Sequence, residues 1–411
     1  MTKILKPDNA EQVLDAVKWA VSEATPLEIR GRGTKDGFGR PVQAGRVLDL
    51  SNLSGISFYD PGELVMTVGP ATPMAEIEQA LADANQELQF EPMDLGVLYG
   101  NASGAGATGS IGGVIAANLS GPRRVKSGAA RDHFLGFQAV SGRGEVFKSG
   151  GRVMKNVTGF DLSKLMAGSF GTLAVMTEVT LKVLPRPEKT RTVLLMGTDD
   201  TTAVGALCDA LGSSHEVAGA AHLPADVAAR SGVGYVSGAG SAVTAVRIEG
   251  PGPSVEHRCN ALRGMFGKLG AVEELHSHNS VAFWREVRDA KPFAGDLADR
   301  QVWRISVPPT AGPGVGRRLI DALGGEVFYD WGGGLIWFAL DPRADAGAGA
   351  VRAAIQDCGG HATLIRAAAD VRQTVDVFQP QPEPLAELSK RVKGAFDPEG
   401  ILNPGRMVAG V

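Results

Sequence analysis

Apolar residues recur at helical spacing in three parts of the chain. The first part predicts a helix over residues 8–22, with a stripe made of Val13, Leu14, Val17 and Val21. The second predicts a helix that starts at Thr72-Pro73, with a face made of Met74, Ile77, Leu81 and Ala84. The third predicts a helix from residue 383, where the residues in phase are Leu385, Leu388, Val392 and Phe396.

Short apolar runs with the period of a strand lie between these helices. In the first part of the chain they predict strands at residues 27–30, 46–50, 63–68 and 172–184. The alternation of strand and helix near the N-terminus predicts a small parallel sheet. Pro185-Arg186-Pro187 breaks the last run, and we place the end of a first domain, residues 1–187, at this point.

Residues 188–370 have a different pattern of strand-like runs and predict a second domain. Helical segments or turns separate six strand-like runs, at residues 192–196, 243–249, 302–307, 326–329, 335–340 and 362–367. The glycines in Asp330-Trp331-Gly332-Gly333-Gly334 predict a hairpin turn between two of these strands. The pattern indicates an antiparallel sheet with helices on one face, and residues 371–411 form a separate C-terminal segment.

The strand at residues 27–30 ends abruptly in a glycine turn, Gly31-Arg32-Gly33-Thr34. Two glycines within three positions let the backbone turn tightly and bring consecutive N–H groups onto one anion. Arg30 and Arg32 add positive charge beside this turn. Together these features predict a pyrophosphate cradle. Because a longer glycine-rich block follows at residues 100–121, we expect a dinucleotide site built from two separate segments.

The glycine-rich block does not fit the two common nucleotide-binding motifs. Residues 104–109 match G-x-G-x-x-G, but a Rossmann fingerprint needs a strand before it and a helix after it, and more glycine follows here. Residues 121–127 lack the second glycine of a P-loop. Small side chains over residues 109–121 instead predict a segment whose backbone closely approaches a flat ligand.

Composition narrows the possible functions. The 411 residues carry a net charge of −4, which argues against a nucleic-acid-binding protein. The three cysteines lie far apart and form neither a zinc motif nor an iron–sulfur ligand run, so we expect reduced thiols. We find no signal peptide and no apolar run long enough to span a membrane, and predict no direct membrane insertion.

Several ordered motifs carry a family resemblance. They are Arg30-Gly-Arg-Gly-Thr34, Pro61-Gly62, Ser110-Ile-Gly-Gly113, Ala129-Ala-Arg-Asp132, Thr158-Gly-Phe-Asp161, residues 165–179 and the ending Phe396-Asp-Pro-Glu-Gly-Ile-Leu-Asn-Pro-Gly405. With them the chain resembles the PCMH-type FAD-binding domain of the vanillyl-alcohol oxidase flavoprotein superfamily. The resemblance covers residues 1–187 and the C-terminal end.

This resemblance implies an α+β fold: an α/β FAD-binding domain of two subdomains, plus an α+β cap domain with an antiparallel sheet. It implies FAD contacts from Arg30, Gly31, Arg32, Gly33, Thr34, Lys35, Gly109, Ser110, Gly112, Gly113, Asn118, Arg131, Asp132, Val179 and Asn403. The first glycine turn would hold the pyrophosphate, residues 109–118 would follow the ribityl chain and the ring, Val179 would lie near the adenine, and Asn403 would reach the flavin from the C-terminal segment. Because Thr34 and Lys35 stand where many relatives carry a flavin-linked His, we predict non-covalent FAD, with His133 as a residual candidate for attachment.

The middle of the chain resembles the FAD-binding E subunit of bacterial glycolate oxidase, through Phe283-Trp-Arg285, Val302-Trp-Arg304 and Tyr329-Asp-Trp-Gly-Gly-Gly334. This narrower resemblance implies oxidation of glycolate, or another small 2-hydroxy acid, within a complex. The implied partners are a second, catalytic FAD subunit and an iron–sulfur subunit. We expect a cytoplasmic protein that contacts the inner membrane only through partners. The alternative is a self-sufficient FAD-dependent D-2-hydroxyacid dehydrogenase.

No catalytic residue is assigned from the sequence, and no metal site is predicted. His276 and His278 would share a face if they lay on a strand, but no carboxylate partner adjoins them, and we favour an exposed loop pair. Arg285, Arg288 and Arg304 have three interpretations: a clamp for a substrate carboxylate, a protein–protein patch beside Trp284 and Trp303, or plain packing. We rank interface and packing above substrate binding.

Overall fold

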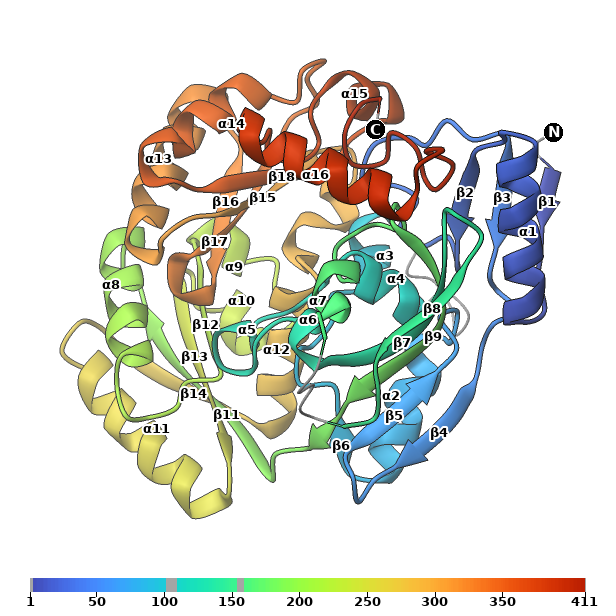
Figure 1. Cartoon of the computed structure of the whole chain (residues 1–411). Coiled ribbons are helices and arrows are strands. Elements are labelled where there is room, and N and C mark those ends of the chain that lie inside the picture. The colour runs from blue at the N-terminus through green and yellow to red at the C-terminus, as the bar shows by residue number, and fades with distance from the viewer. Residues whose placement is uncertain (1–2, 101–108, 154–158, 411) are drawn as a thin grey trace.

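The fold is described from a computed structural model that covers residues 3–100, 109–153 and 159–410. Figure 1 shows two regions side by side, with the last helix lying across the junction between them. We call the region with the three-stranded and the five-stranded sheet the N-terminal part, and the eight-stranded sheet with its helices the cap. Among the described residues, no helix combines the length and apolar character needed to cross a bilayer.

The N-terminal part begins with the small parallel sheet that the sequence predicts. Its strand order is β1-β3-β2, with bounds Lys3–Leu5, Arg46–Asp49 and Leu27–Arg30. Helix α1 (Ala10–Ser22) packs on this sheet through Val13 and Val17, which are fully buried. The Asn9 side chain caps the helix by accepting a hydrogen bond from the Gln12 amide.

An antiparallel five-stranded sheet completes the N-terminal part. Its order is β4-β5-β9-β7-β8, with bounds Ile56–Asp60, Val65–Val68, Ala174–Lys182, Phe134–Ser141 and Val146–Gly150. Two short strands, β6 (Gln86–Glu87) and β10 (Leu184–Pro185), pair beside it. The helices of this region are α2 (Met74–Asp83), α3 (Leu95–Leu98), α4 (Ile111–Ala116), α5 (Arg124–Ser127), α6 (Ala130–His133) and α7 (Leu162–Met166).

The cap contains one eight-stranded sheet in which every ladder is antiparallel, as the sequence predicts. Its order is β14-β11-β13-β12-β16-β17-β15-β18, with bounds Val272–His276, Lys189–Met196, Val243–Gly250, Gly219–Leu223, Glu326–Asp330, Leu335–Leu340, Gln301–Ser306 and His361–Arg366. The predicted hairpin connects β16 to β17, where Asp330 pairs with Leu335. All eight strands fall inside residues 188–370; where an independently folding unit begins stays a prediction.

Helices cover one face of the cap sheet, and the other face packs on the N-terminal part. The outer helices are α8 (Asp200–Leu211), α11 (Gly252–Phe266), α13 (Gly312–Leu323) and α14 (Ala348–Ile355), which bury apolar residues against the sheet. Helix α12 (Ser277–Arg288) differs, because its Phe283 and Trp284 join the apolar cluster shared with the N-terminal part. Shorter elements are α9 (Ala225–Ala228), α10 (Gly234–Ser237), α15 (Ala369–Thr374), and the 3-10 turns Lys291–Phe293, Gly295–Leu297, Pro309–Ala311, Trp331–Gly333 and Gln356–Cys358.

The C-terminal segment returns to the first parallel sheet. Helix α16 (Glu383–Phe396) forms where its apolar period predicts, but Leu385 and Leu388 are about half exposed, at 47% and 50%. After it, the Leu27 amide donates to the Ile401 carbonyl at 2.7 Å, and Leu402 pairs with Leu27 in a parallel bridge. The last residues therefore extend the sheet that carries the first glycine turn.

An ion network joins the N-terminal part to the cap. Arg123 contacts Glu87 at 2.7 Å and Glu249 at 2.8 Å, and Arg247 contacts Glu91 at 2.7 Å. Both arginine side chains are almost fully buried, at 8% and 2% exposure. Arg123, Glu87 and Glu91 belong to the N-terminal part and the other two residues to the cap, so the network ties the two together.

The carboxylates of Glu87, Glu91 and Glu249 share the two guanidinium groups of this network. Glu87 and Glu91 differ in pKa, because they differ in how strongly the arginines attract them. Burial raises the pKa of Glu87 to about 7, and its attraction to Arg123 does not compensate. Burial acts the same way on Glu91, but Arg247 and Arg123 overcome it and hold its pKa at about 2. The Arg247 pair is therefore the charged core of the network.

Replacement of Arg247 by Gln tests this network. We expect a lower melting temperature, because removing one partner of a buried ion pair costs about 3–5 kcal/mol. Arg186→Gln is the matched control: its guanidinium lies 3.9 Å from Glu87 and is half exposed, so its contribution is small. Circular dichroism melting of both variants makes the comparison, and equal melting temperatures would contradict the assignment.

Candidate functional site

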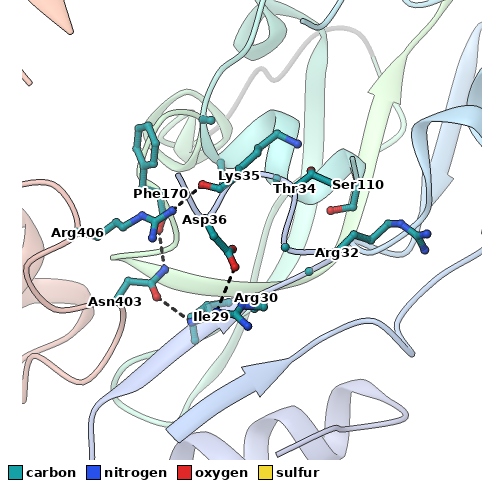
Figure 2. A pocket seen from close by; sticks show the side chains of 15 residues that line it. Ile29, Arg30, Arg32, Thr34, Lys35, Asp36, Ser110, Phe170, Asn403 and Arg406 are labelled. Atoms are coloured by element: carbon teal, nitrogen blue, oxygen red, sulfur yellow. Dashed lines mark hydrogen bonds and ion pairs between the residues drawn. The ribbon is translucent and has the colours of Figure 1, made fainter. Parts of the chain in front are cut away.

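Two separate stretches of chain and the C-terminal segment meet around one cavity of about 90 Å³. Nine of the predicted site residues line it: Arg30, Gly31, Arg32, Gly33, Thr34, Lys35, Ser110, Gly113 and Asn403. The first six lie at the end of β2 and in the turn after it, and the next two lie at the start of α4. Figure 2 shows Lys35, Thr34 and Ser110 lying together on one side of this cavity.

Glycine allows the two stretches to approach one another. A Cβ at Gly109 would lie 2.5 Å from Lys35 Nζ and 3.0 Å from Thr34 Oγ1, and a Cβ at Gly31 would lie 2.8 Å from Ser110 Oγ. These distances are too short for a Cβ, so a side chain at Gly109 would displace the Lys35 ammonium and one at Gly31 would displace the Ser110 hydroxyl. Gly33 takes a left-handed φ of 72°, which glycine adopts without strain.

The second stretch is anchored to the start of α2. The Gly112 amide donates to the Pro70 carbonyl at 2.7 Å, and the Ile111 amide donates to the Thr72 carbonyl at 3.1 Å. A Cβ at Gly112 would lie 2.7 Å from the Pro70 carbonyl oxygen, which is backbone and has little room to shift. Gly112 is thus required for the position of Ser110 and Gly113, although it does not line the cavity itself.

Positive charge gathers at the cavity without full neutralisation. Burial lowers the pKa of Lys35 to about 8, and attraction to Asp94 offsets this only in part. Arg30 contacts Asp36 at 3.2 Å and Glu28 at 2.9 Å, yet its buried Nε has no hydrogen-bond partner. A desolvated ammonium and an unsatisfied guanidinium N–H beside a glycine turn suit a phosphate-containing anion.

Asn403 holds the cavity wall together. Its Oδ1 accepts from the Ile29 amide at 2.7 Å, and its Nδ2 donates to the Phe170 carbonyl at 2.7 Å. The sequence did not point to Arg406, whose Nη2 donates to the Lys35 carbonyl at 2.9 Å. Figure 2 shows the contact of Asn403 with Ile29 and that of Arg406 with Lys35. The only signal for Arg406 was its place one residue after the Asn-Pro-Gly ending.

Four other predicted site residues lie away from this cavity. Asn118 accepts a hydrogen bond from the Arg131 amide at 3.1 Å, and Asp132 accepts one from the Ala129 amide at 2.8 Å. Val179 is fully buried within β9 and pairs with strands on both sides. Their contacts with FAD stay predictions, and residues 101–108 and 154–158, which complete two of the predicted motifs, lie outside the described residues.

The histidine pair and two of the arginines considered from the sequence do not form a site in the structure. His276 ends β14 and His278 lies in the first turn of α12, so the two are not alternate positions on one strand; both are exposed. Within the described residues no group of three His, Cys, Asp or Glu side chains is placed to hold a metal ion. Arg288 pairs with Asp289 at 2.7 Å, and Arg285 is exposed.

Comparison with known proteins agrees with the geometry. Residues 2–150 match the FAD binding domain family, and residues 379–407 match the C-terminal domain of FAD linked oxidases. Over 98% of this chain and 98% of the relative, the sequence is 36% identical to the glycolate oxidase subunit GlcE of Escherichia coli (strain K12). This chain belongs to the GlcE family of FAD-linked oxidoreductases.

More distant relatives share the fold. The glycolate oxidase subunit GlcD of the same Escherichia coli strain is 24% identical over 98% of this chain and 83% of its own length. A 4-ethylphenol oxidase from Gulosibacter chungangensis superimposes with a TM-score of 0.73 at 15% identity, over 98% of this chain and 88% of the oxidase. The PCMH-type fold with a cap is therefore confirmed, and FAD is the cofactor of this family.

The cavity fits the central part of FAD. The negative charge of a diphosphate would balance the Lys35 ammonium, and a diphosphate oxygen could accept a hydrogen bond from the unsatisfied Arg30 Nε. A cavity of about 90 Å³ is too small for the whole dinucleotide, so the remainder of FAD would lie beyond it.

Gly109→Ala tests the close approach of the two stretches. The added methyl group meets Lys35 and Thr34, so we expect the FAD dissociation constant to rise at least about tenfold. Gly205→Ala in α8 is the control, because a Cβ there meets nothing within 4 Å. Titration of both apoproteins with FAD, followed by flavin fluorescence, gives the constants. Unchanged affinity in Gly109→Ala would place the diphosphate elsewhere.

The pKa of Lys35 predicts a pH dependence. A diphosphate binds the protonated amine better, so FAD affinity is constant below a pH of about 8 and falls above it, by up to about tenfold per pH unit. Lys35→Met removes this slope, whereas Lys148→Met, at an exposed position on β8, retains it. FAD dissociation constants of the wild type and both variants, measured below and above this pKa, give the slopes. A slope that survives in Lys35→Met would assign the titration to another group.

Proposed function

We propose that this chain is the FAD-binding subunit of a glycolate oxidase-type complex. The complex would oxidise a small 2-hydroxy acid, glycolate to glyoxylate, and pass the electrons to an iron–sulfur subunit. The observation that carries the proposal is similarity to a glycolate oxidase subunit over 98% of both chains. The similarity spans the cap as well as the region that matches the FAD binding domain family.

The residues of this chain would hold and orient the cofactor. FAD held by these residues would supply the redox chemistry of this subunit within the complex. Lys35 and the backbone N–H groups of the glycine turn bind its diphosphate. The inner face of the cap sheet closes over the N-terminal part and limits access of water. Asn403 links β2 to the segment at Phe170 and so fixes the first glycine turn within the N-terminal part.

Attachment of FAD would be non-covalent. Thr34 and Lys35 occupy the first glycine turn, and neither supplies an imidazole. His133, the residual candidate, is buried and its Nε2 contacts the Ser127 carbonyl at 2.9 Å. It does not line the cavity. These contacts support a flavin that denaturation releases intact.

Relay of single electrons would need another chain. An iron–sulfur cluster takes four protein ligands, typically thiolates, whereas this sequence has three widely spaced cysteines. Cys208, Cys259 and Cys358 are free thiols in the structure. The proposed partners are therefore an iron–sulfur subunit and a second FAD subunit of the GlcD type, which the family relationship supports.

Anaerobic visible absorbance tests the proposal. We expect the oxidised flavin band of the isolated FAD-loaded chain to persist with glycolate or D-lactate and to bleach when the partner subunits are added. Bleaching of the isolated chain would instead identify a self-sufficient D-2-hydroxyacid dehydrogenase. A chain that takes up no FAD, or a complete complex that glycolate never reduces, would reject the proposed function.

A further inference from the structure

Two guanidinium groups lie against one indole ring at the junction of the N-terminal part and the cap. The Cζ atoms of Arg124 and Arg304 each lie 4.9 Å from the centroid of the Trp331 ring. Arg124 belongs to α5, Arg304 to β15, and Trp331 to the turn between β16 and β17. Three segments that are distant in the sequence thus gather two cations around one aromatic side chain.

The register of the cap sheet turns Arg304 toward the N-terminal part. Arg304 pairs with Trp337 on β17 and with Thr363 on β18. Trp337 belongs to the apolar cluster that the cap shares with the N-terminal part, so this is the inner face of the sheet. His361 lies two residues before Thr363 and therefore points to the same face. The cluster of Arg124, Arg304, Trp331 and His361 is an inner-face feature of the cap junction.

The positive charge of this cluster is not balanced. Across residues 3–100, 109–153 and 159–410, neither Arg124 nor Arg304 makes an ion pair or a side-chain hydrogen bond. Asp330, which attracts Arg304, is 2% exposed, accepts a hydrogen bond from its neighbour's amide, and has its pKa raised by burial to about 7. Asp132 attracts Arg124 but is itself paired with Lys164 at 3.1 Å. Burial and repulsion from Arg124 lower the pKa of Arg304 to about 10.

The side chains of the cluster are partly accessible to solvent. Arg124, Arg304 and Trp331 are partly exposed, and His361 is exposed. Stacking uses the flat face of a guanidinium group and leaves its N–H edge free to form paired hydrogen bonds. A small carboxylate matches that edge in both shape and charge.

The cluster is also continuous with the FAD site. Trp331 Nε1 donates to the Gly121 carbonyl at 3.1 Å. Gly121 ends the glycine-rich stretch that starts at Gly109 beside Lys35. One continuous segment therefore leads from the phosphate cradle to the cationic cluster.

We propose that Arg124 and Arg304, held by Trp331, bind the carboxylate of the small 2-hydroxy acid; this inference rests on the proposed function. The ligand class is a short-chain carboxylate with its charge against the two N–H edges. Arg124 comes from the N-terminal part and Arg304 from the cap, so a bound carboxylate bridges the two. Arg285 and Arg288, the other arginines considered from the sequence, take no part.

Equilibrium binding of oxalate to the FAD-loaded full chain tests this site. Oxalate has no C–H bond from which a hydride can leave, so calorimetry measures binding without turnover. We expect R124Q and R304Q each to raise the oxalate dissociation constant at least about tenfold, because each removes a charge-assisted pair. R285Q, at an exposed arginine of the cap, should leave the constant within about twofold of the wild type.

Two controls show that a loss of oxalate affinity comes from the guanidinium groups: the R304K variant and the flavin content of each variant. R304K keeps the charge but loses the planar fork, so its affinity should fall between those of the wild type and R304Q. FAD loading and melting temperature of each variant show that it is folded, and R124Q carries the test from the other side should R304Q fail to fold. Wild-type affinity in both R124Q and R304Q, or no oxalate binding by the wild type, would overturn the proposal. Weakened oxalate binding in a complex that glycolate never reduces would uphold the carboxylate site and reject the proposed function instead.

Discussion

The buried ion network between the N-terminal part and the cap is the interaction on which the rest of the structure depends. Arg123 and Arg247 bridge carboxylates from both sides of the junction in surroundings that exclude most water. Electrostatic attraction is strong there, but an unpaired charge would be costly, so the network tolerates little displacement. Arg123 directly precedes α5, and Arg124 begins it and contacts the Trp331 ring instead, so two consecutive arginines give the junction a buried ion pair and a partly exposed cation.

The cavity at the first glycine turn depends on a second constraint, the close approach of backbone to side chains. The glycines at positions 31 and 109 face the ends of side chains at distances that a Cβ would not tolerate without their displacement. Contacts from Pro70, Thr72 and the C-terminal Asn403 hold both stretches in place from outside. The conformation of these glycine-rich stretches is therefore set by their neighbours, because glycine itself restricts the backbone little.

Much of the architecture could be predicted because local periodicity carries it. Strand β2 and helix α1 form where the apolar pattern places them, and the six predicted cap strands all exist. In the N-terminal part, strands β1, β4, β7 and β8 escaped prediction, and in the cap β12 and β14 did. The sequences of the two cap strands, Gly-Ala-Ala-His-Leu and Val-Glu-Glu-Leu-His, lack the bulky alternation that marks a strand, and pairing with neighbours stabilises them instead. Likewise the apolar face of α16 predicted burial that Leu385 and Leu388 do not show.

The sequence by itself determined the glycine turn, its flanking charge and those helices and strands that have a clear apolar period, because these depend on neighbouring residues. Only the tertiary structure decided which distant residues share a site. Arg406 reaches the cradle from the far end of the chain, and Arg124 and Arg304 meet at Trp331. Such meetings follow from sheet register and from the packing of the cap on the N-terminal part, and no local pattern encodes them. The same arginine residue can line a ligand site, pair with a neighbour or face solvent, and the fold alone selects among these roles.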